Sequence, residues 1–248
     1  MIRLPSLTQR ILTNPIQGGV PMFTFKRVET EDELKEVFKL RYQVYCLECG
    51  FESTADHPSG TERDEYDEHS VHFIAKDRHD NIVGTVRLIK SSELGFPIEK
   101  HCKTRLDTSQ VPKDSAVEVS RLAISKLYRR RAGDDLYGAS GSTVDESSSA
   151  GHSQRRRPEI VLGLYKAMYR ESKWLGVVNW YAVMEKSLFQ LLKVSGVVFN
   201  QIGDVTEYHG NRIPYIARIS NIERQIAQRK PELFHFFTDW ERDSTYSI

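Results

Sequence analysis

The feature that most constrains the fold is an apolar run at residues 116–125 that carries two charges in its middle. Its length and its content of valine, leucine and isoleucine predict a buried strand. Glu118 and Arg121 interrupt the run, and charged side chains are unusual in a central strand unless they are paired. Their odd spacing would send them to opposite faces of a regular strand. If both serve one site, a β-bulge must intervene, and bulges concentrate beside active sites.

The surrounding pattern predicts a mixed sheet with helices on both faces, an α/β (α+β) fold. The expected elements are a strand at 23–28, a helix at 31–46 with a capping box at Thr30 and Glu33, hairpin strands at 69–77 and 82–90, the strand at 116–125, a helix at 158–175, a strand at 177–184, a helix at 187–194, strands at 197–202 and 212–219, and a helix at 221–229 before an aromatic tail. Neighbouring strands in the first half are antiparallel. The helix between the strands at 116–125 and 177–184 implies one parallel crossover.

Composition bounds the organisation and the partners. The 248 residues suit an irregular arm at 1–22 and a single domain at 23–248, with a disordered insertion at 133–157 that is rich in Gly, Ser and Asp. The net charge of +1 excludes a global attraction to nucleic acid. No apolar run approaches the ~18 residues of a membrane span, no secretory leader is present, and three cysteines are a poor disulfide framework. We therefore expect a cytoplasmic protein.

Two further arginines lie on apolar elements. Arg41 falls within the apolar stripe that Leu34 and Phe38 define on the first helix, so it must be paired unless it reaches the rim. Arg87 lies on a strand whose opposite face is wholly apolar, and it either joins a site or marks a solvated face. Asp64 and Asp67 can face one way in a single turn and are the natural partners, although acidic loops are often only solvated.

The ordered set of motifs resembles the acyl-homoserine-lactone (autoinducer) synthases and the N-acyl amino acid synthases. The set comprises a helical Arg-x-x-x-aromatic, an aromatic residue, Asp-x-x-Asp, a strand Arg, a second aromatic residue and Glu-x-x-Arg, at Arg41, Tyr45, Phe51, Asp64, Asp67, Arg87, Phe96, Glu118 and Arg121. The chain looks most like the acyltransferases of PEP-CTERM/exosortase systems. It departs from the autoinducer synthases at Phe51, where those enzymes often have Trp, and in its insertion and longer C-terminal part.

The resemblance implies a GNAT-like fold and an acyl thioester donor, carried by acyl carrier protein or coenzyme A, with no tightly bound cofactor. It implies that Arg41, Asp64, Asp67, Arg87, Glu118 and Arg121 form a charged cluster near the acceptor, with Glu118 as the candidate base. Tyr45, Phe51 and Phe96 would line the aromatic side of the pocket. The strand residues Ser120, Leu122, Ala123 and Ile124 would complete it, and backbone N–H groups freed at a bulge could bind the oxyanion.

The donor site is expected at the start of the helix at 158–175, where phosphate is favoured. Arg-x-x-Gly at residues 130–133 weakly resembles the GNAT pyrophosphate loop. The candidate donor residues are Arg129, Arg130, Arg131, Gly133, Arg155, Arg156 and Arg157. The same arginines could dock an acidic carrier protein or form a generic basic surface.

Other signals are weaker. Cys46 and Cys49 form a lone Cys-x-x-Cys without a second paired motif, so we expect no metal site, even with Cys102 counted. The aromatic residues at 174–181 are expected in the core. Those at 234–240 either pack at the C-terminus or make a peripheral membrane contact.

We therefore expect an N-acyltransferase that moves a fatty acyl group from acyl carrier protein or acyl-coenzyme A to the amine of an amino acid or a similar acceptor. The alternatives are an autoinducer synthase that uses S-adenosylmethionine, an ordinary acetyltransferase, and a non-catalytic module that binds acyl carrier protein.

Overall fold

The computed structural model describes residues 22–107, 111–128 and 157–239. Its centre is an eight-stranded sheet in the order β1-β2-β3-β4-β5-β8-β6, with β7 paired to β8. The strands are β1 (Phe23–Arg27), β2 (Ser70–Asp77), β3 (Ile82–Lys90), β4 (Ala116–Ile124), β5 (Asn179–Met184), β6 (Asn200–Gln201), β7 (Thr206–Glu207) and β8 (Asn211–Arg218). Only β4 and β5 pair in parallel among these strands. The predicted mixed, mostly antiparallel sheet is confirmed.

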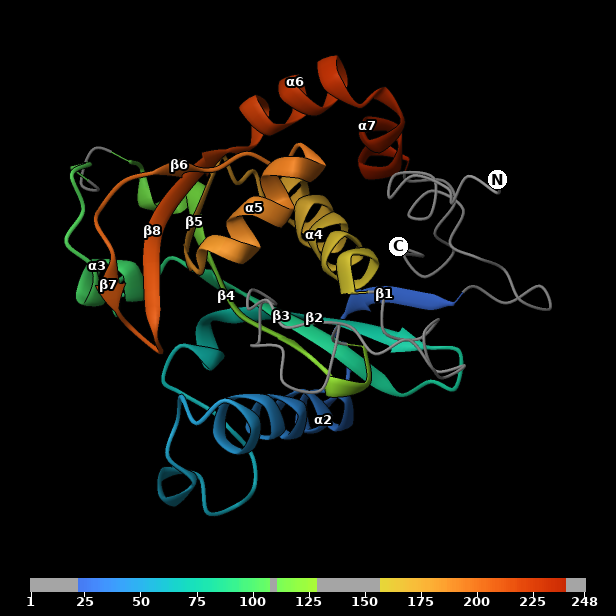
Figure 1. Ribbon diagram of the computed structural model, residues 1–248, viewed down its shortest axis with the longest axis vertical. Helices are drawn as coiled ribbons and strands as arrows, with labels where there is room; N and C mark the ends of the chain where they lie inside the picture. The colour runs from blue at the N-terminus through green and yellow to red at the C-terminus, as the bar shows by residue number, and fades with distance from the viewer. Residues whose placement is uncertain (1–21, 108–110, 129–156, 240–248) are drawn as a thin grey trace, which may run out of the picture.

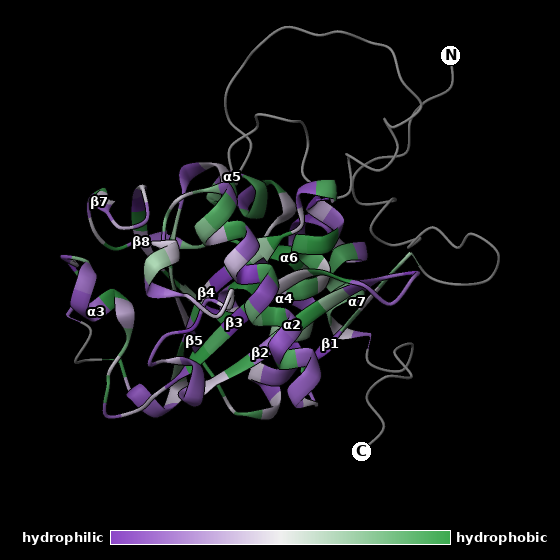
Figure 2. Ribbon diagram, turned by 90° about the horizontal axis from the view of Figure 1, so that it is seen from below, coloured by the Kyte–Doolittle hydropathy of each residue, from purple (hydrophilic) through white to green (hydrophobic). Residues whose placement is uncertain are grey.

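Helices cover both faces of the sheet (Figure 1). On one face lies α2 (Glu31–Tyr42), and on the other lie α4 (Arg157–Trp174), α5 (Lys186–Ser195), α6 (Ile219–Arg229) and α7 (Pro231–Thr238). The short helix α3 (Pro97–His101) lies near the β7–β8 edge. Because α4 follows β4 and precedes β5, it forms the predicted parallel crossover. Hydrophobic residues gather along the central strands and α4 in Figure 2.

The alternation of β3 decides which side chains meet which helix. A Cβ added to Gly84 would lie 2.8 Å from Ile160 of α4, so Gly84 allows close packing of the helix on the sheet. Val86 and Leu88 share this face and belong to the main core. The alternate residues, Arg87 among them, therefore point to the α2 side. The charged side chains of the candidate active site gather on this side of the sheet.

Several elements differ from the expectation, among them β6, which is shorter than the strand expected at 197–202, and β7, which was not expected. The helix expected at 31–46 ends as an α-helix at Tyr42 and continues as a π-helix at Gln43–Glu48. Such widened turns are rare in proteins overall, and many of those that occur lie at functional sites. The C-terminal part forms α7, where only an aromatic tail was expected, and the ring of Phe237 lies edge-on to Tyr169 at 5.7 Å. Trp174 is 77% exposed, so placing it in the core was wrong, although Trp180 and Tyr181 are buried.

The expected arm at 1–22 and the insertion at 133–157 lie almost wholly outside the described residues. None of the helices in the described ranges has the length and apolar character needed to span a bilayer.

Candidate active site

A β-bulge in β4 shapes the site. Arg87 pairs with Ser120 and Thr85 pairs with Ala123, so two residues of β4, Arg121 and Leu122, lie opposite a single residue of β3. Arg121 has a φ of +49°, a left-handed conformation that few residues other than glycine adopt. The extra residue lets the side chain of Arg121 join the face that carries Ser120 and Arg87. The bulge expected from the odd spacing of Glu118 and Arg121 is therefore confirmed.

Arg41 is fully buried, with 0% of its surface exposed. Its Nε donates to Glu62 at 2.5 Å, and its two terminal nitrogens donate to the Asp67 carboxylate at 2.6 and 3.2 Å. The alternative in which Arg41 extends to the rim is excluded. A guanidinium in an apolar stripe is tolerated here because two carboxylates satisfy its donors.

Arg87 is 1% exposed and reaches the same acidic turn. It forms a bidentate pair with Asp64 at 2.5 and 2.9 Å, and it donates to Asp67 at 2.7 Å. Its Nε also donates to the hydroxyl of Ser120 at 3.0 Å. The interpretation of a solvated strand face is excluded. Asp64 and Asp67 face one way as predicted, because both accept from Arg87.

Arg121 completes the set. Its Nε donates to Glu62 at 3.1 Å, and its Nη2 lies 3.0 Å from Glu52 and 3.1 Å from Asp64. Its guanidinium lies over the ring of Tyr45, 5.4 Å from the centroid. Three arginines and four carboxylates are thus joined, and we call them the buried ion network: Arg41, Arg87, Arg121, Glu52, Glu62, Asp64 and Asp67.

Sequence reasoning missed two members of this network, Glu52 and Glu62. Both lie in the polar segment before β2, where no periodicity distinguishes one acidic residue from the next. Comparing the numbers of opposite charges could have indicated them. Three arginines on apolar elements need more carboxylate partners than Asp64 and Asp67 provide.

The network perturbs its carboxylates strongly. Burial would raise the pKa of Glu62, but the guanidinium groups of Arg41 and Arg121 outweigh it and lower that pKa to about 2. Burial likewise opposes ionisation of Asp67, yet Arg41 and Arg87 hold its pKa well below the usual value. Both carboxylates are therefore charged at neutral pH.

These shifts predict a loss of stability in acid. A carboxyl group whose pKa is lower in the folded protein than in the unfolded chain stabilises the fold at pH values above the unfolded pKa, which is about 4.5 for Glu. This contribution to stability disappears as the pH falls toward 2. For Glu62 alone it amounts to roughly 3 kcal/mol. We expect urea unfolding between pH 6 and 3 to show a shallower pH dependence for Glu62→Gln than for wild type. Glu31→Gln, an exposed control, should follow wild type. Equal slopes for all three would contradict the assignment.

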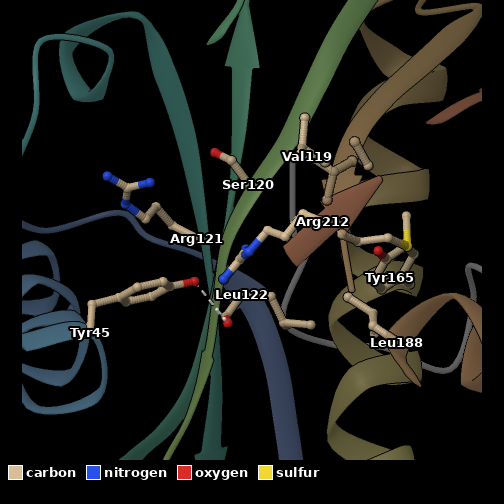
Figure 3. A pocket seen from close by; sticks show the side chains of 11 residues that line it. Tyr45, Val119, Ser120, Arg121, Leu122, Tyr165, Leu188 and Arg212 are labelled. Atoms are coloured by element: carbon tan, nitrogen blue, oxygen red, sulfur yellow. Dashed lines mark hydrogen bonds between the residues drawn. The ribbon is translucent and has the colours of Figure 1, made fainter. Parts of the chain in front are cut away.

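A hollow opens where the two parallel strands separate. The pairing of β4 with β5 ends at Val119 and Ala182, and both strands continue beyond that point. The space between them is a cavity of about 30 Å³ that opens to solvent, and it is lined by Tyr45, Val119, Ser120, Arg121, Leu122, Tyr165, Ala182, Val183, Met184, Leu188 and Arg212. In Figure 3, Tyr45 and Arg121 lie on one side of β4, and Tyr165 and Leu188 on the other. The hollow therefore joins the charged face to the apolar face.

Part of the expected pocket lines this hollow. Tyr45 and Ser120 do so, and the hydroxyl of Tyr45 donates to the carbonyl of Leu122 at 3.1 Å. Phe51 lies beside Tyr45, with 6.2 Å between the ring centroids. Ala123 and Ile124 were expected to line the acceptor site, but they are buried in the main core and are absent from the lining.

Glu118 lies on the same strand face as Ser120 but outside the lining of the hollow, and it is 2% exposed. Its carboxyl accepts from the backbone N–H of Ile98 at 2.9 Å. Burial raises the pKa of Glu118 to about 8, although the Ile98 N–H and the charge of Arg87 oppose this. Phe96 faces Tyr181 across 5.7 Å in an apolar group beside Glu118, so grouping Phe96 with Tyr45 and Phe51 was wrong.

The expected donor residues are described only in part. Arg157 begins α4 and is half-buried. Arg129, Arg130, Arg131, Gly133, Arg155 and Arg156 lie outside the described residues. Cys46, Cys49 and Cys102 form no disulfide, and the described residues contain no group of three metal-binding side chains. The residues of the hollow that sequence reasoning missed come mainly from β5, α5 and β8. Among them, Arg212 is charged.

Comparison with known proteins finds similar sequences and similar folds. Residues 40–138 match the acetyltransferase (GNAT) domain family. An acyl-homoserine-lactone synthase of Aliivibrio fischeri is 26% identical over 175 residues, which are 70% of this chain and 78% of that protein. A second such synthase, from Aliivibrio fischeri strain ATCC 700601 / ES114, is 24% identical over the same shares.

Solved structures extend the similarity to most of the chain. The coenzyme A-dependent acyl-homoserine lactone synthase BjaI with MTA superposes with a TM-score of 0.58 at 18% identity, covering 83% of this chain and 89% of BjaI. FeeM, an N-acyl amino acid synthase from uncultured soil microbes, gives 0.53 at 12% identity and coverages of 86% and 99%. The narrower resemblance to PEP-CTERM acyltransferases stays a prediction. The chain is thus an acyltransferase with a GNAT fold, similar to acyl-homoserine-lactone synthases and to an N-acyl amino acid synthase.

Proposed function

We propose that the protein is an N-acyltransferase that moves a fatty acyl group from a thioester of acyl carrier protein or coenzyme A to the amine of an amino acid or a similar acceptor. The observation that carries this proposal is the hollow between β4 and β5. Its apolar side, with Leu188 and Met184, suits an acyl chain, and its other side adjoins the buried ion network, which suits a charged acceptor.

The chemistry follows from these surroundings. The acceptor ammonium gives up a proton to the Glu118 carboxylate through a water or a hydroxyl, because Glu118 does not line the hollow. The neutral amine attacks the thioester carbonyl, and backbone N–H groups of the unpaired part of β4 bind the developing oxyanion. The nitrogen of the tetrahedral intermediate then gives up its second proton, the intermediate collapses as the carbon–sulfur bond breaks, and the carrier leaves as a thiolate that takes up that proton. The products are an acyl amide and the free carrier thiol.

One alternative has a specific observation in its favour. The similarity to the Aliivibrio fischeri synthases and to BjaI, which was solved with SAM and isopentyl-CoA, supports an acceptor such as S-adenosylmethionine. The similarity to FeeM supports an amino acid. A cytoplasmic location, the absence of a nucleic-acid partner and a peripheral membrane contact stay sequence-based predictions.

Mass spectrometry of the product separates these possibilities. Purified protein is incubated with acyl-coenzyme A or acyl carrier protein thioesters of graded chain length, together with the common amino acids or S-adenosylmethionine. We expect a long-chain acyl amide whose mass equals the fatty acid plus the amino acid minus one water. A lactone product would establish an autoinducer synthase instead. Turnover with acetyl-coenzyme A alone would indicate an ordinary acetyltransferase, and thioester binding without turnover a non-catalytic module.

A further inference from the structure

A tyrosine of β5 lies directly beside the proposed base in the sheet. Tyr181 pairs with Glu118 in the parallel ladder between β5 and β4, so the two side chains are neighbours on one face. We propose that Tyr181 is a positioning residue for Glu118, and that its hydroxyl donates a hydrogen bond to the Glu118 carboxylate when this group is ionised and ready to accept the amine proton. This inference rests on the proposed function and adds a second residue to its base.

The pair stands at the closed end of the hollow. The next residues of β4 and β5, Val119 and Ala182, are the last that pair with each other. One step further along the face that carries Glu118, Ser120 lines the hollow. Tyr181 therefore adjoins the place where the acceptor amine would lose its proton.

The hydroxyl of Tyr181 is buried and has no hydrogen-bond partner among the described residues. The side chain is 1% exposed, and its ring faces Phe96 at 5.7 Å in an apolar group that also contains Ile89 and Ile98. Leaving a buried hydroxyl unpaired is unfavourable, and phenylalanine would fill nearly the same space without that penalty. The tyrosine is therefore explained by a second state of the protein, in which the hydroxyl has an acceptor.

Ionisation of Glu118 creates such a state. Burial raises the pKa of Glu118 to about 8, so the group is mostly protonated at pH 7. Its carboxyl accepts from the N–H of Ile98 at 2.9 Å, and the described residues supply no other hydrogen bond to it. A neutral carboxyl tolerates this, but a carboxylate in apolar surroundings needs further donors. Tyr181 holds a hydroxyl donor on the neighbouring strand.

The other groups around Glu118 are less suited to this task. The titratable and charged groups that face it include Arg87 of β3, Arg121 of β4, Glu99 and Cys102 in and beside α3, Tyr181, and Tyr208 in the turn before β8. Both arginines already donate to carboxylates of the buried ion network, and Glu99 adds a repelling charge. Burial raises the pKa of Cys102 to about 11, but a thiol is only a weak donor.

Tyr181 keeps its own proton throughout the transfer. Burial, helped by the charges of Glu99 and Glu118, raises the pKa of Tyr181 to about 12. The amine proton therefore moves to the Glu118 carboxylate, while the phenol only donates a hydrogen bond. Because this bond favours the charged form of Glu118, it increases the fraction of protein whose base is ready at neutral pH.

The first test measures the ionisation of Glu118 and does not require turnover. Infrared difference spectra of wild type against Glu118→Gln identify the carbonyl band of protonated Glu118, which should disappear as pH rises through about 8. We expect Tyr181→Phe to move this midpoint upward by roughly 1–2 pH units, the effect of losing a hydrogen bond to a charged group. Tyr215→Phe is the matched control, because Tyr215 is buried on the adjacent β8 but packs in the main core.

The second test follows kcat/KM between pH 6 and 9.5. Tyr181→Phe should lower kcat/KM roughly 10- to 100-fold at pH 7 but less than about fivefold at pH 9.5, because the carboxylate forms in both proteins at high pH. The Tm at pH 6 should not fall, since Glu118 is protonated there and the deleted hydroxyl had no partner among the described residues. A tyrosine needed only for structure would lower the Tm at pH 6 and lower kcat/KM by one factor at every pH.

The outcomes separate this inference from the proposed function. An unchanged infrared midpoint in Tyr181→Phe, or an equal upward shift in Tyr215→Phe, overturns the role of Tyr181 while N-acyl transfer stands. A lower Tm at pH 6 with an unchanged pH profile overturns it as well. If wild-type protein transfers no acyl group, the proposed function fails, and the infrared midpoint still decides whether Tyr181 stabilises the Glu118 carboxylate. Circular dichroism of each variant verifies that it is folded.

Discussion

Arg41→Met will destabilise the protein by about 3–5 kcal/mol, the cost of breaking a buried ion pair by removing one partner. Methionine fits an apolar stripe and has high helix propensity, so neither packing nor helix formation opposes the change. The cost arises from Glu62 and Asp67, which would remain buried without the five donors of the guanidinium. For a domain of this size the loss corresponds to roughly 6–20 °C in Tm.

The matched control is Lys39→Met on the same helix. Lys39 pairs with Glu36 at 2.7 Å, but both side chains are more than half exposed, so this pair is worth at most about 1 kcal/mol. Adding Glu62→Gln to Arg41→Met should recover part of the loss, because it removes one of the two buried carboxylates that lose Arg41 as a partner and keep only one arginine each. Urea unfolding at pH 7 measures all three. A loss for Arg41→Met no greater than that for Lys39→Met would mean that the network does not stabilise the fold.

The parts of the site that could be predicted from sequence are those where a charge breaks a strong periodic pattern. Arg41 interrupts a helical stripe, and Arg87 and Arg121 interrupt strands, so each had either to find a partner or to reach solvent. The bulge followed from the odd spacing of Glu118 and Arg121 combined with the assumption of a shared site. The mixed sheet followed from one crossover helix between two apolar strands.

The parts that could not be predicted depend on where strands stop pairing and on loops without periodicity. The hollow exists because β4 and β5 diverge after Val119 and Ala182, and no residue type at those positions signals divergence. In the sequence, Arg212 is a polar residue near the start of a strand and carries no special signal. Only the fold brings it beside Phe51. Phe96 and Phe51 are both isolated aromatic residues in the sequence, yet Phe51 packs against Tyr45, which lines the hollow, whereas Phe96 packs against Tyr181 beside Glu118.

We expect Glu118→Gln, which removes the proposed general base, to lower kcat/KM by about 10²–10⁴-fold, the range for losing such a group. The active form of the base is the carboxylate, and the pKa of Glu118 is raised to about 8, so wild-type kcat/KM should increase as pH rises through 8. The glutamine cannot accept a proton, so this increase should vanish in the variant. Steady-state kinetics between pH 6 and 9.5 measure both effects, and exposed Glu93→Gln serves as the control.

Glu118→Gln should also stabilise the protein as the pH rises from 5 to 8. In the folded state Glu118 keeps its proton up to about pH 8, whereas in the unfolded chain it releases the proton near pH 4.5. Between these values the unfolded state binds fewer protons, so wild-type stability falls as pH rises. Glutamine carries no charge and escapes this loss, so the Tm of Glu118→Gln should exceed that of wild type by a margin that grows from pH 5 to 8. A merely structural glutamate would give the opposite sign, since its removal would lower the Tm at every pH. An active variant with unchanged stability would show that Glu118 is neither buried as a neutral acid nor the base.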